Sequence, residues 1–356
     1  MELRNRFVRS ATGDGCAESG YVTPNQIKLF DGLASGGVGL IITGVTYVNQ
    51  SGQINPYHNS AATDDCILPF RRLTDAVHYY GAKIALQLVH AGRERANWFN
   101  DKHAVAPSVT EQDPHFRGGA YREITEQEIE ETIFSFGRAA KRAKDAGFDA
   151  VQVHAAHSFL LSQFLSPFTN HRLDQWGGPL ENRIRIHSEI CRNMRKEVGD
   201  DFPLLIKFGV ADAFKGGLEF SDGLRAAMIL AQSGFDALEI SQGLRGEFFH
   251  ETEFRTGIDS IDQEGYFKAW AAEVKKNVSI PVMAVGGFRT FELMEDTIRR
   301  KEADYISLCR PFIREPDLVN VWERRNHRRS KCISCNECIN VVKSGQPLYC
   351  PLEKEV

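Results

Sequence analysis

The chain has 356 residues, 42% of them hydrophobic, which is enough to bury a core of barrel size together with a small appendage. Its formal net charge of −4 gives no general field that attracts polyanions, so the composition disfavours a nucleic-acid partner. No apolar run reaches the roughly 18 residues of a membrane span and no signal peptide opens the chain, so we expect a soluble, cytoplasmic protein without a membrane partner.

Short apolar or β-branched runs alternate with helical patterns along almost the whole chain. A helix is predicted between Thr125 and Ala146, because Thr125 and Glu128 form a capping box, apolar residues repeat at helical spacing, and Gly147 supplies the stop. Eight runs predict strands, in chain order Phe7–Ser10, Val38–Thr43, Lys83–Leu88, Ala150–His154, Leu204–Phe208, Ala237–Ser241, Val282–Val285 and Tyr305–Leu308.

Two segments repeat one pattern, because AGFDAVQVH at 146–154 resembles SGFDALEIS at 233–241. Each reads as a helix end, a glycine, an Asp-Ala pair and a strand. Such units without hairpin signals imply parallel strands, and eight of them imply a closed (β/α)8 TIM barrel. The alternative is an open doubly wound sheet, which would want a GxGxxG loop that Ser10 to Gly15 does not provide.

In a barrel of this kind the active site gathers residues just beyond the carboxyl ends of the strands. His154 and His157 stand at such an end and form a pair of hydrogen-bond donors. Gly286 and Gly287 follow the seventh strand and Arg310 follows the eighth. Backbone N–H groups beside a cation at this place indicate a site for a phosphorylated cofactor. Alternatively, the glycines only make a tight turn and Arg310 lies at the surface.

The eight cysteines are unevenly placed. Four are scattered, as is typical of small buried hydrophobic residues: Cys16, Cys66, Cys191 and Cys309. The other four fall within the last 25 residues: Cys332, Cys335, Cys338 and Cys350. Without a secretion signal this clustering favours metal binding over disulfides, and the spacing is that of a 4Fe–4S cluster. A Zn²⁺ ion on the same thiolates, or no metal, are the alternatives. We therefore predict a barrel over residues 1–326 and a short cysteine-rich tail over residues 327–356.

Several long motifs, in the right order, resemble the old yellow enzyme family of FMN-dependent NADH:flavin oxidoreductases, or ene-reductases. The matching stretches are Asn5-Arg6, ALQLVHAGR at 85–93, HAAH at 154–157, QFLSPFTNHRLDQWGGPLENR at 163–183 and ISLCRPFIREP at 306–316. The resemblance covers nearly the whole barrel, and it implies an enzyme with FMN at the barrel mouth.

By this resemblance the cofactor contacts can be assigned residue by residue. Lys207 would lie near the N1–C2=O region of the flavin, where a fixed cation favours reduction because the reduced ring carries negative charge. The remaining contacts would be Ser10, Ala11, Thr12 and Gly13 at the flavin edge, Val45 through its backbone, Gln87 at the pyrimidine ring, and Gly286, Gly287 and Arg310 at the phosphate, with Cys309 beside them.

The resemblance also gives the histidines a role. His154 and His157 would hydrogen-bond the carbonyl oxygen of an α,β-unsaturated small-molecule substrate, and stabilise the charge that builds there during hydride addition at the β-carbon. Alternatively, one imidazole only braces the loop. NAD(P)H or a separate electron-donor protein would supply the electrons.

One position departs from the family pattern. Many members carry a tyrosine five residues after the first histidine, as the acid that protonates the α-carbon, whereas this chain has Phe159. A phenyl ring has no proton to give. The step must then be done by water, by another residue or not at all, and Tyr21 and Tyr266 are loop tyrosines that could reach the site.

The cysteine run resembles one that follows the barrel in trimethylamine dehydrogenase and bacterial 2,4-dienoyl-CoA reductase, where a 4Fe–4S cluster lies next to FMN. Those enzymes continue into large nucleotide-binding domains, whereas this chain stops at Val356. The alternative functions are therefore a partner-dependent flavin/Fe–S electron-transfer subunit and an oxidative dehydrogenase of the trimethylamine-dehydrogenase type. An RNA-acting FMN barrel is disfavoured by the acidic composition, and a homo-oligomer is left open.

Overall fold

The computed structural model describes residues 1–111 and 113–352. The strands are β1 Phe7–Arg9, β2 Leu40–Tyr47, β3 Asn59–Ser60, β4 Lys83–Val89, β5 Val105–Ala106, β6 Arg122–Glu123, β7 Ala150–Ala155, β8 Leu204–Gly209, β9 Ala237–Ser241, β10 Val282–Ala284 and β11 Tyr305–Leu308. The α-helices are α1 Pro24–Ser35, α2 Ile67–His78, α3 Glu126–Asp145, α4 Leu160–Leu165, α5 Leu180–Arg183, α6 Arg185–Val198, α7 Phe220–Ser233, α8 Lys268–Asn277, α9 Phe291–Arg299, α10 Arg310–Arg314, α11 Leu318–Glu323 and α12 Glu337–Lys343.

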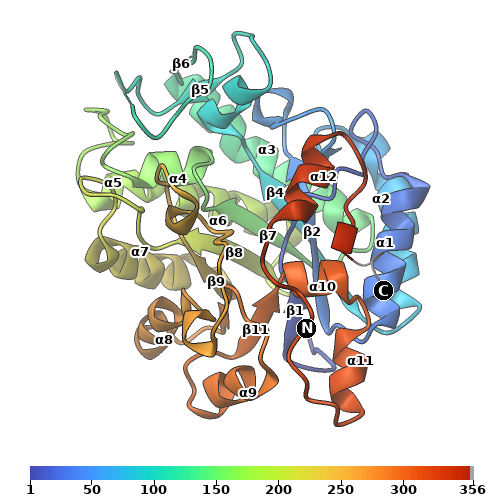
Figure 1. The fold of residues 1–356 in the computed structure, drawn as a ribbon. Helices are drawn as coiled ribbons and strands as arrows, with labels where there is room; N and C mark the ends of the chain where they lie inside the picture. Colours follow the sequence, from blue (N-terminus) through green and yellow to red (C-terminus); the bar gives the residue numbers. More distant parts are fainter. Residues whose placement is uncertain (112, 353–356) are drawn as a thin grey trace.

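Eight parallel strands close into a barrel, in the order β1-β11-β10-β9-β8-β7-β4-β2, with β1 pairing back to β2. Figure 1 shows the helices arranged around the outside of this barrel. The predicted (β/α)8 barrel is therefore confirmed, and all eight predicted strands are present. Strand β2 runs on to Tyr47, beyond its predicted end, because a register shift between Ile42 and Val45 carries the strand past Gly44.

The helix-capping and helix-stop signals predicted from the sequence are present at the ends of α3. The hydroxyl of Thr125 accepts a hydrogen bond from the Glu128 N–H, and the Glu128 carboxylate accepts one from the Thr125 N–H, so the predicted capping box begins α3. The helix stops just before Gly147, whose φ of 89° is a conformation that glycine adopts without strain. Inward-facing apolar residues fill the barrel: Val8, Leu40, Ile42, Ala85, Ala150, Leu205, Ala237 and Met283.

The cysteine-rich tail folds back onto the barrel. The backbone N–H of Leu348 donates to the carbonyl of Asp14 at 2.9 Å, and the Val342 side chain lies against Gly15. In Figure 1 the tail is red, and its helix α12 is labelled in front of the barrel. The described part of the tail therefore forms one wall of the barrel mouth, while residues 353–356 lie outside the described residues. Among the described helices, none is long and apolar enough to cross a membrane.

Candidate active site

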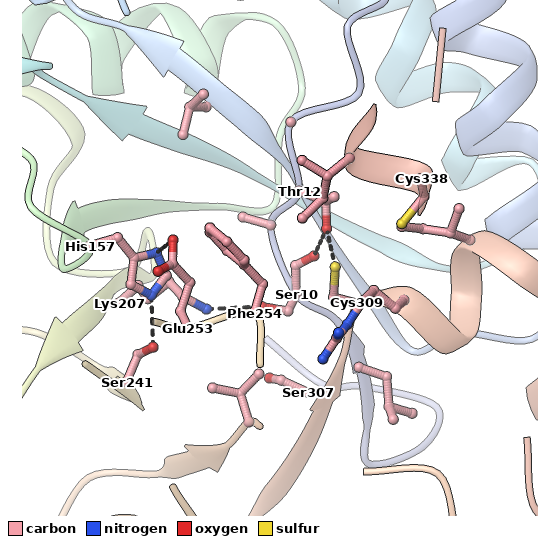
Figure 2. Close-up of a pocket in the computed structure, with 18 of the residues that line it drawn as sticks. Ser10, Thr12, His157, Lys207, Ser241, Glu253, Phe254, Ser307, Cys309 and Cys338 are labelled. Carbon is pink, nitrogen blue, oxygen red and sulfur yellow. Dashed lines mark hydrogen bonds and ion pairs between the residues drawn. The ribbon is translucent and has the colours of Figure 1, made fainter. Parts of the chain in front are cut away.

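A cavity of about 340 Å³ opens at the carboxyl ends of the barrel strands, the end at which such barrels carry their active sites. Its volume falls within the range of roughly 300–1,000 Å³ found for small-molecule sites. Figure 2 shows side chains from distant parts of the chain converging on it. The structure brings to this one cavity every catalytic and cofactor residue that the sequence predicts: Ser10, Ala11, Thr12, Gly13, Val45, Gln87, His154, His157, Lys207, Gly286, Gly287, Cys309 and Arg310.

The two histidines are neighbours, with ring centroids 4.9 Å apart and nearly perpendicular planes. His154 is in β7, and its Nδ1 accepts a hydrogen bond from the Ala156 N–H, so its proton is on Nε2. His157 follows in a tight turn with φ of 58°, and its Nε2 lies 2.7 Å from the hydroxyl of Ser241 at the end of β9. The chain turn after β7 thus presents two fixed imidazoles to one space.

Both imidazoles are held neutral. Burial is the first reason that the pKa of each lies well below the usual range of histidine, and the charges of Lys207 and Arg245 lower each pKa further. A neutral imidazole carries one N–H donor. The pair can therefore donate two hydrogen bonds to an oxygen atom without bringing net charge into the cavity.

Phe159 lies against the pair, with its ring 4.8 Å from the ring of His154 and perpendicular to it. Neither tyrosine considered from the sequence takes the missing position. Tyr21 does not line the cavity, is partly exposed, and donates its hydroxyl proton to Asp65. Tyr266 does line the cavity, but its hydroxyl donates to the carbonyl of Glu253 at 2.6 Å.

The loop that follows β9 contributes residues that the sequence analysis missed. Glu253 places a carboxylate oxygen 3.6 Å from Nδ1 of His157, and the Arg245 guanidinium holds that carboxylate at 2.9 and 3.0 Å from its Nε. Although burial lowers the pKa of Arg245, the Glu253 carboxylate raises it above its ordinary value. Arg245 also lies 5.8 Å over the Phe159 ring. No local motif marks this loop, because its role depends on how it folds over the barrel.

The floor of the cavity is a chain of buried polar side chains. Gln87 donates to Gln152 at 2.7 Å, and Gln152 donates to Glu239 at 2.9 Å. Lys207 lies 3.0 Å from the same Glu239 carboxylate. The expected cation is therefore present, but it is paired with a fully buried acid that the sequence analysis did not include.

A cluster of unsatisfied donors marks the other end of the cavity. Nε and Nη2 of Arg289 and the hydroxyl of Ser307 are buried without a hydrogen-bond partner, and both residues line the cavity. The buried Glu264 carboxylate lies 3.9 Å from the Arg289 Nε, an ion pair too long for a hydrogen bond. Gly286 and Gly287 lie beside these donors with φ of 124° and 75°, and their N–H groups make no backbone hydrogen bond among the described residues. Orphaned donors of this kind are costly unless an anion satisfies them. The signal in the sequence was a cation placed two residues after the Gly-Gly pair.

Arg310 is buried at the same end and connects it to the tail. Its guanidinium donates at 2.7 Å to the carbonyl of Arg255 and at 2.7 Å to the side-chain oxygen of Asn336. These partners are neutral oxygens, so the positive charge of Arg310 is not cancelled by them. The interpretation of Arg310 as a surface residue is wrong, since it is 8% exposed.

These observations fit FMN. The cavity is large enough for a small cofactor. Nε and Nη2 of Arg289, the Ser307 hydroxyl and the N–H groups of Gly286 and Gly287 lack hydrogen-bond partners among the described residues, and Arg310 adds charge where a phosphate would lie. The amide of Gln87 and the ammonium of Lys207 lie at the cavity floor, where they could face the polar edge of a heteroaromatic ring.

All four tail cysteines line a second, smaller cavity beside α10. Cys338, Arg310 and Ile313 line both cavities, so the two adjoin. Among residues 1–111 and 113–352, no three Cys, His, Asp or Glu side chains are placed to hold a single metal ion. A Zn²⁺ ion needs sulfurs about 2.3 Å from the metal, whereas a four-iron cluster holds its cysteines around a larger body.

The scattered cysteines divide into two kinds. Cys16, Cys66 and Cys191 are buried, as predicted. Cys309 is only partly buried, and its sulfur lies 2.9 Å from the hydroxyl of Thr12 at the cavity wall, as Figure 2 shows. The interpretation of Cys309 as a buried core residue is therefore wrong, because it directly follows β11 at the open end of the barrel.

Comparison with known proteins places residues 1–328 within the family described as NADH:flavin oxidoreductase / NADH oxidase. A metal reductase of Desulforamulus reducens is 34% identical over 100% of this chain and 52% of its own length. An NADH oxidase of Thermoanaerobacter brockii is 36% identical over 94% of the chain and 51% of its own. A cinnamate reductase of Clostridium sporogenes is 32% identical over 98% and 55%. The chain thus spans about half the length of these curated relatives.

Solved structures resemble the whole chain. A complex of 2-naphthoyl-CoA reductase with 2-naphthoyl-CoA has a TM-score of 0.88 and 28% identity, over 99% of this chain and 56% of that one. Histamine dehydrogenase from Rhizobium has a TM-score of 0.83 and 27% identity, over 99% and 51%. An old yellow enzyme homologue from Zymomonas mobilis, with a TM-score of 0.77 and 24% identity over 99% and 94%, shares the fold.

Proposed function

The chain belongs to the NADH:flavin oxidoreductase / NADH oxidase family, as its resemblance to old yellow enzymes predicted, and on that premise we propose that it is an FMN-dependent reductase of activated C=C bonds. The substrate is an α,β-unsaturated carbonyl compound, and the electrons come from NAD(P)H or from another donor. When bound, FMN supplies hydride transfer. The observation that carries the proposal is the pair of neutral imidazoles, His154 and His157, facing the same cavity as the unsatisfied donors.

The histidines act on the substrate oxygen. His154 donates from Nε2, because its Nδ1 already accepts the Ala156 N–H, and His157 donates from Nδ1 when Ser241 donates to its Nε2. Two fixed donors stabilise the negative charge that builds on that oxygen, as an oxyanion hole does. Because both rings are neutral, they donate without transferring their own protons.

The proton for the α-carbon comes from solvent or from Tyr57, whose side chain also lines the cavity. Phe159 has none to give, and the Tyr266 hydroxyl is already engaged with the Glu253 carbonyl. Glu253 is the one acidic side chain that lines the cavity among the described residues, and both of its carboxyl oxygens accept from Nε of Arg245. The loop after β9 therefore orients His157 rather than acting as the acid.

We further propose that the tail binds a 4Fe–4S cluster, with Zn²⁺ as the alternative metal. The support is that Cys332, Cys335, Cys338 and Cys350 line one cavity, and that Cys338 also lines the cavity proposed for FMN. A cluster held there supplies one-electron transfer. We keep the division into a barrel over 1–326 and a tail over 327–356 as part of this proposal.

The function is tested by loading the full chain with FMN and measuring NADH and NADPH oxidation with 2-cyclohexenone, cinnamaldehyde, cinnamate and an enoyl thioester. Turnover of at least one C=C substrate is expected, and removal of both imidazoles in His154→Ala/His157→Ala should abolish it. p-Hydroxybenzaldehyde should bind with a new long-wavelength absorption that the double variant lacks. Flavin-loaded protein that turns over only with a viologen or ferredoxin donor would assign the electron supply to a partner. Loaded protein that reduces no substrate with any donor contradicts the proposal.

Oxidation of amines is a second candidate, favoured by the structural similarity to histamine dehydrogenase. The two N–H donors oppose it, because an uncharged amine nitrogen offers one lone pair whereas a carbonyl oxygen offers two. Reduction of the FMN-loaded protein by histamine or trimethylamine, without reduction of any enone, would select this function instead.

A further inference from the structure

Glu239 is an acid within the barrel, in β9, and it is completely buried. Glu239 does not line the cavity itself, but it contacts three side chains at the cavity floor. The Ser10 hydroxyl donates to its Oε1 at 2.6 Å, the Lys207 ammonium lies 3.0 Å from the same oxygen, and the Gln152 amide donates to its Oε2 at 2.9 Å. Ser10 and Lys207 do line the cavity, and Figure 2 labels both there.

The carboxylate determines the direction of the hydrogen bonds above it. An ionised carboxylate only accepts, so Gln152 must turn its NH₂ group toward Glu239. The carbonyl oxygen of Gln152 then faces Gln87 and accepts from its amide at 2.7 Å. One N–H of Gln87 is thereby occupied. Through Gln152, Glu239 therefore determines which donor and acceptor of the Gln87 amide remain for a ligand.

The same carboxylate cancels the charge of Lys207. Burial raises the pKa of Glu239, but Lys207 together with the hydrogen bonds from Ser10 and Gln152 lowers it by more, so Glu239 is ionised. Both partners are buried, with side-chain exposures of 5% for Lys207 and 0% for Glu239. Charges this far from water interact strongly with whatever lies beside them. The cavity floor thus presents a neutral pair rather than the lone cation that the sequence predicts.

We propose that Glu239 is a positioning residue for bound FMN, which keeps the floor neutral and orients Gln87, and so holds the reduction potential below the value that Lys207 alone would give. This inference rests on the proposed function, because it requires that FMN binds here. Reduction adds negative charge to the cofactor, and an unpaired Lys207 would favour that state.

Glu239→Gln tests this with nearly unchanged shape. The variant removes the negative charge, and its amide N–H can donate to Gln152, whose own amide can then reverse. We expect the affinity for reduced FMN, relative to oxidised FMN, to rise about tenfold or more, which is a shift of about +30 mV for a two-electron couple. The midpoint potential is measured by equilibration with reference dyes, and the flavin absorption spectrum should shift because Gln87 is no longer held in one orientation.

Asp149→Asn is the matched control. Asp149 is also a mostly buried acid paired with a lysine, Lys83 at 2.8 Å, but it precedes β7 and lies at the opposite end of the barrel. The midpoint potential of FMN bound to Asp149→Asn should equal that of FMN bound to the unmodified chain. The double variant Lys207→Met/Glu239→Gln removes both charges, so its FMN potential should return toward the value of the unmodified chain. It also replaces Glu239→Gln in the test if that single variant does not fold. The inference is overturned if Glu239→Gln has the same FMN potential as the unmodified chain. If Glu239→Gln does not fold, the inference is overturned if the double variant has the same FMN potential as Lys207→Met. Failure of the unmodified chain to bind FMN would contradict the proposed function instead.

Discussion

Nε2 of His157 lies 2.7 Å from the hydroxyl of Ser241, although 84 positions separate the two residues in the chain. His157 is neutral, so it has one proton to place on one of its two nitrogens. A Ser241 hydroxyl that donates to Nε2 keeps that proton on Nδ1, the nitrogen that faces the cavity side of the ring near Glu253. Ser241, at the end of β9, thus determines which nitrogen of His157 can donate a hydrogen bond to a substrate.

Ser241→Ala should weaken substrate polarisation without removing either histidine. One neutral hydrogen bond is worth about 1 kcal/mol, so we expect kcat/KM for an enone to fall about fivefold. Binding of p-hydroxybenzaldehyde should weaken in parallel. Ser241→Thr restores the hydroxyl and should recover both. Equal behaviour of the Ala and Thr variants would show that the hydroxyl does not fix the tautomer.

Phe159→Tyr should add the missing acid. The ring already packs 4.8 Å from that of His154 in the cavity wall, so a hydroxyl group there reaches the substrate space. General acids contribute roughly 10²–10⁴-fold, and we expect enone turnover to rise by on the order of tenfold or more. Phe159→Leu controls for packing and should not increase turnover. An unchanged rate in the tyrosine variant would mean that protonation by solvent or Tyr57 is not limiting.

Arg289→Met should separate binding of the phosphate from binding of the flavin ring. The Nε and Nη2 donors of Arg289 are buried and unsatisfied, so a phosphate would gain charged hydrogen bonds from them, worth roughly 1.5–3 kcal/mol. We expect affinity for FMN to fall at least tenfold while affinity for riboflavin stays the same, as measured by flavin fluorescence quenching. A parallel loss for both ligands would place Arg289 outside the phosphate site.

The cysteine tail should bind iron only as a complete set. After anaerobic reconstitution with iron and sulfide, we expect about four irons per chain and an absorbance near 400 nm that bleaches on reduction. Cys335→Ser should lose the cluster, whereas Cys191→Ser, at a buried cysteine remote from the tail, should retain it. Stoichiometric zinc without iron would select the structural-zinc alternative.

His187 should make the fold sensitive to acid. Its side chain is fully buried, and burial lowers its pKa to about 3, although hydrogen bonding to the backbone of Ile184 and Leu161 raises the pKa in part. In the unfolded chain it takes up a proton below about pH 6.5, so its contribution to stability is complete above that pH and decreases as the pH falls toward 3. At pH 5 the loss is about 2 kcal/mol. Other buried histidines add to the same trend.

His187→Leu should remove this part of the acid sensitivity. The midpoint of urea unfolding, measured at about pH 7.5 and pH 5, should fall less for the variant than for the unmodified chain. An identical pH dependence in both proteins would show that His187 is already solvated or protonated in the folded state.

Much of the fold could be predicted because its signals are local. The bounds of β9 and β11 match the prediction, and the Thr125 capping box begins α3 as expected, since neighbouring residues alone decide these features. The error at β2 arose where the strand continues past Gly44 through a register shift, which only its pairing with β4 reveals.

The candidate site divides in the same way. The sequence by itself determined the family, the (β/α)8 barrel and the set of residues at the strand ends, because the positions of strand ends in such a barrel follow from chain order. The tertiary structure alone decided that Lys207 is neutralised by Glu239, that Tyr21 lies away from the cavity, and that Glu253 lies beside His157. Those facts depend on which side chains of separate strands and loops meet in space, and no neighbouring residue in the sequence specifies them.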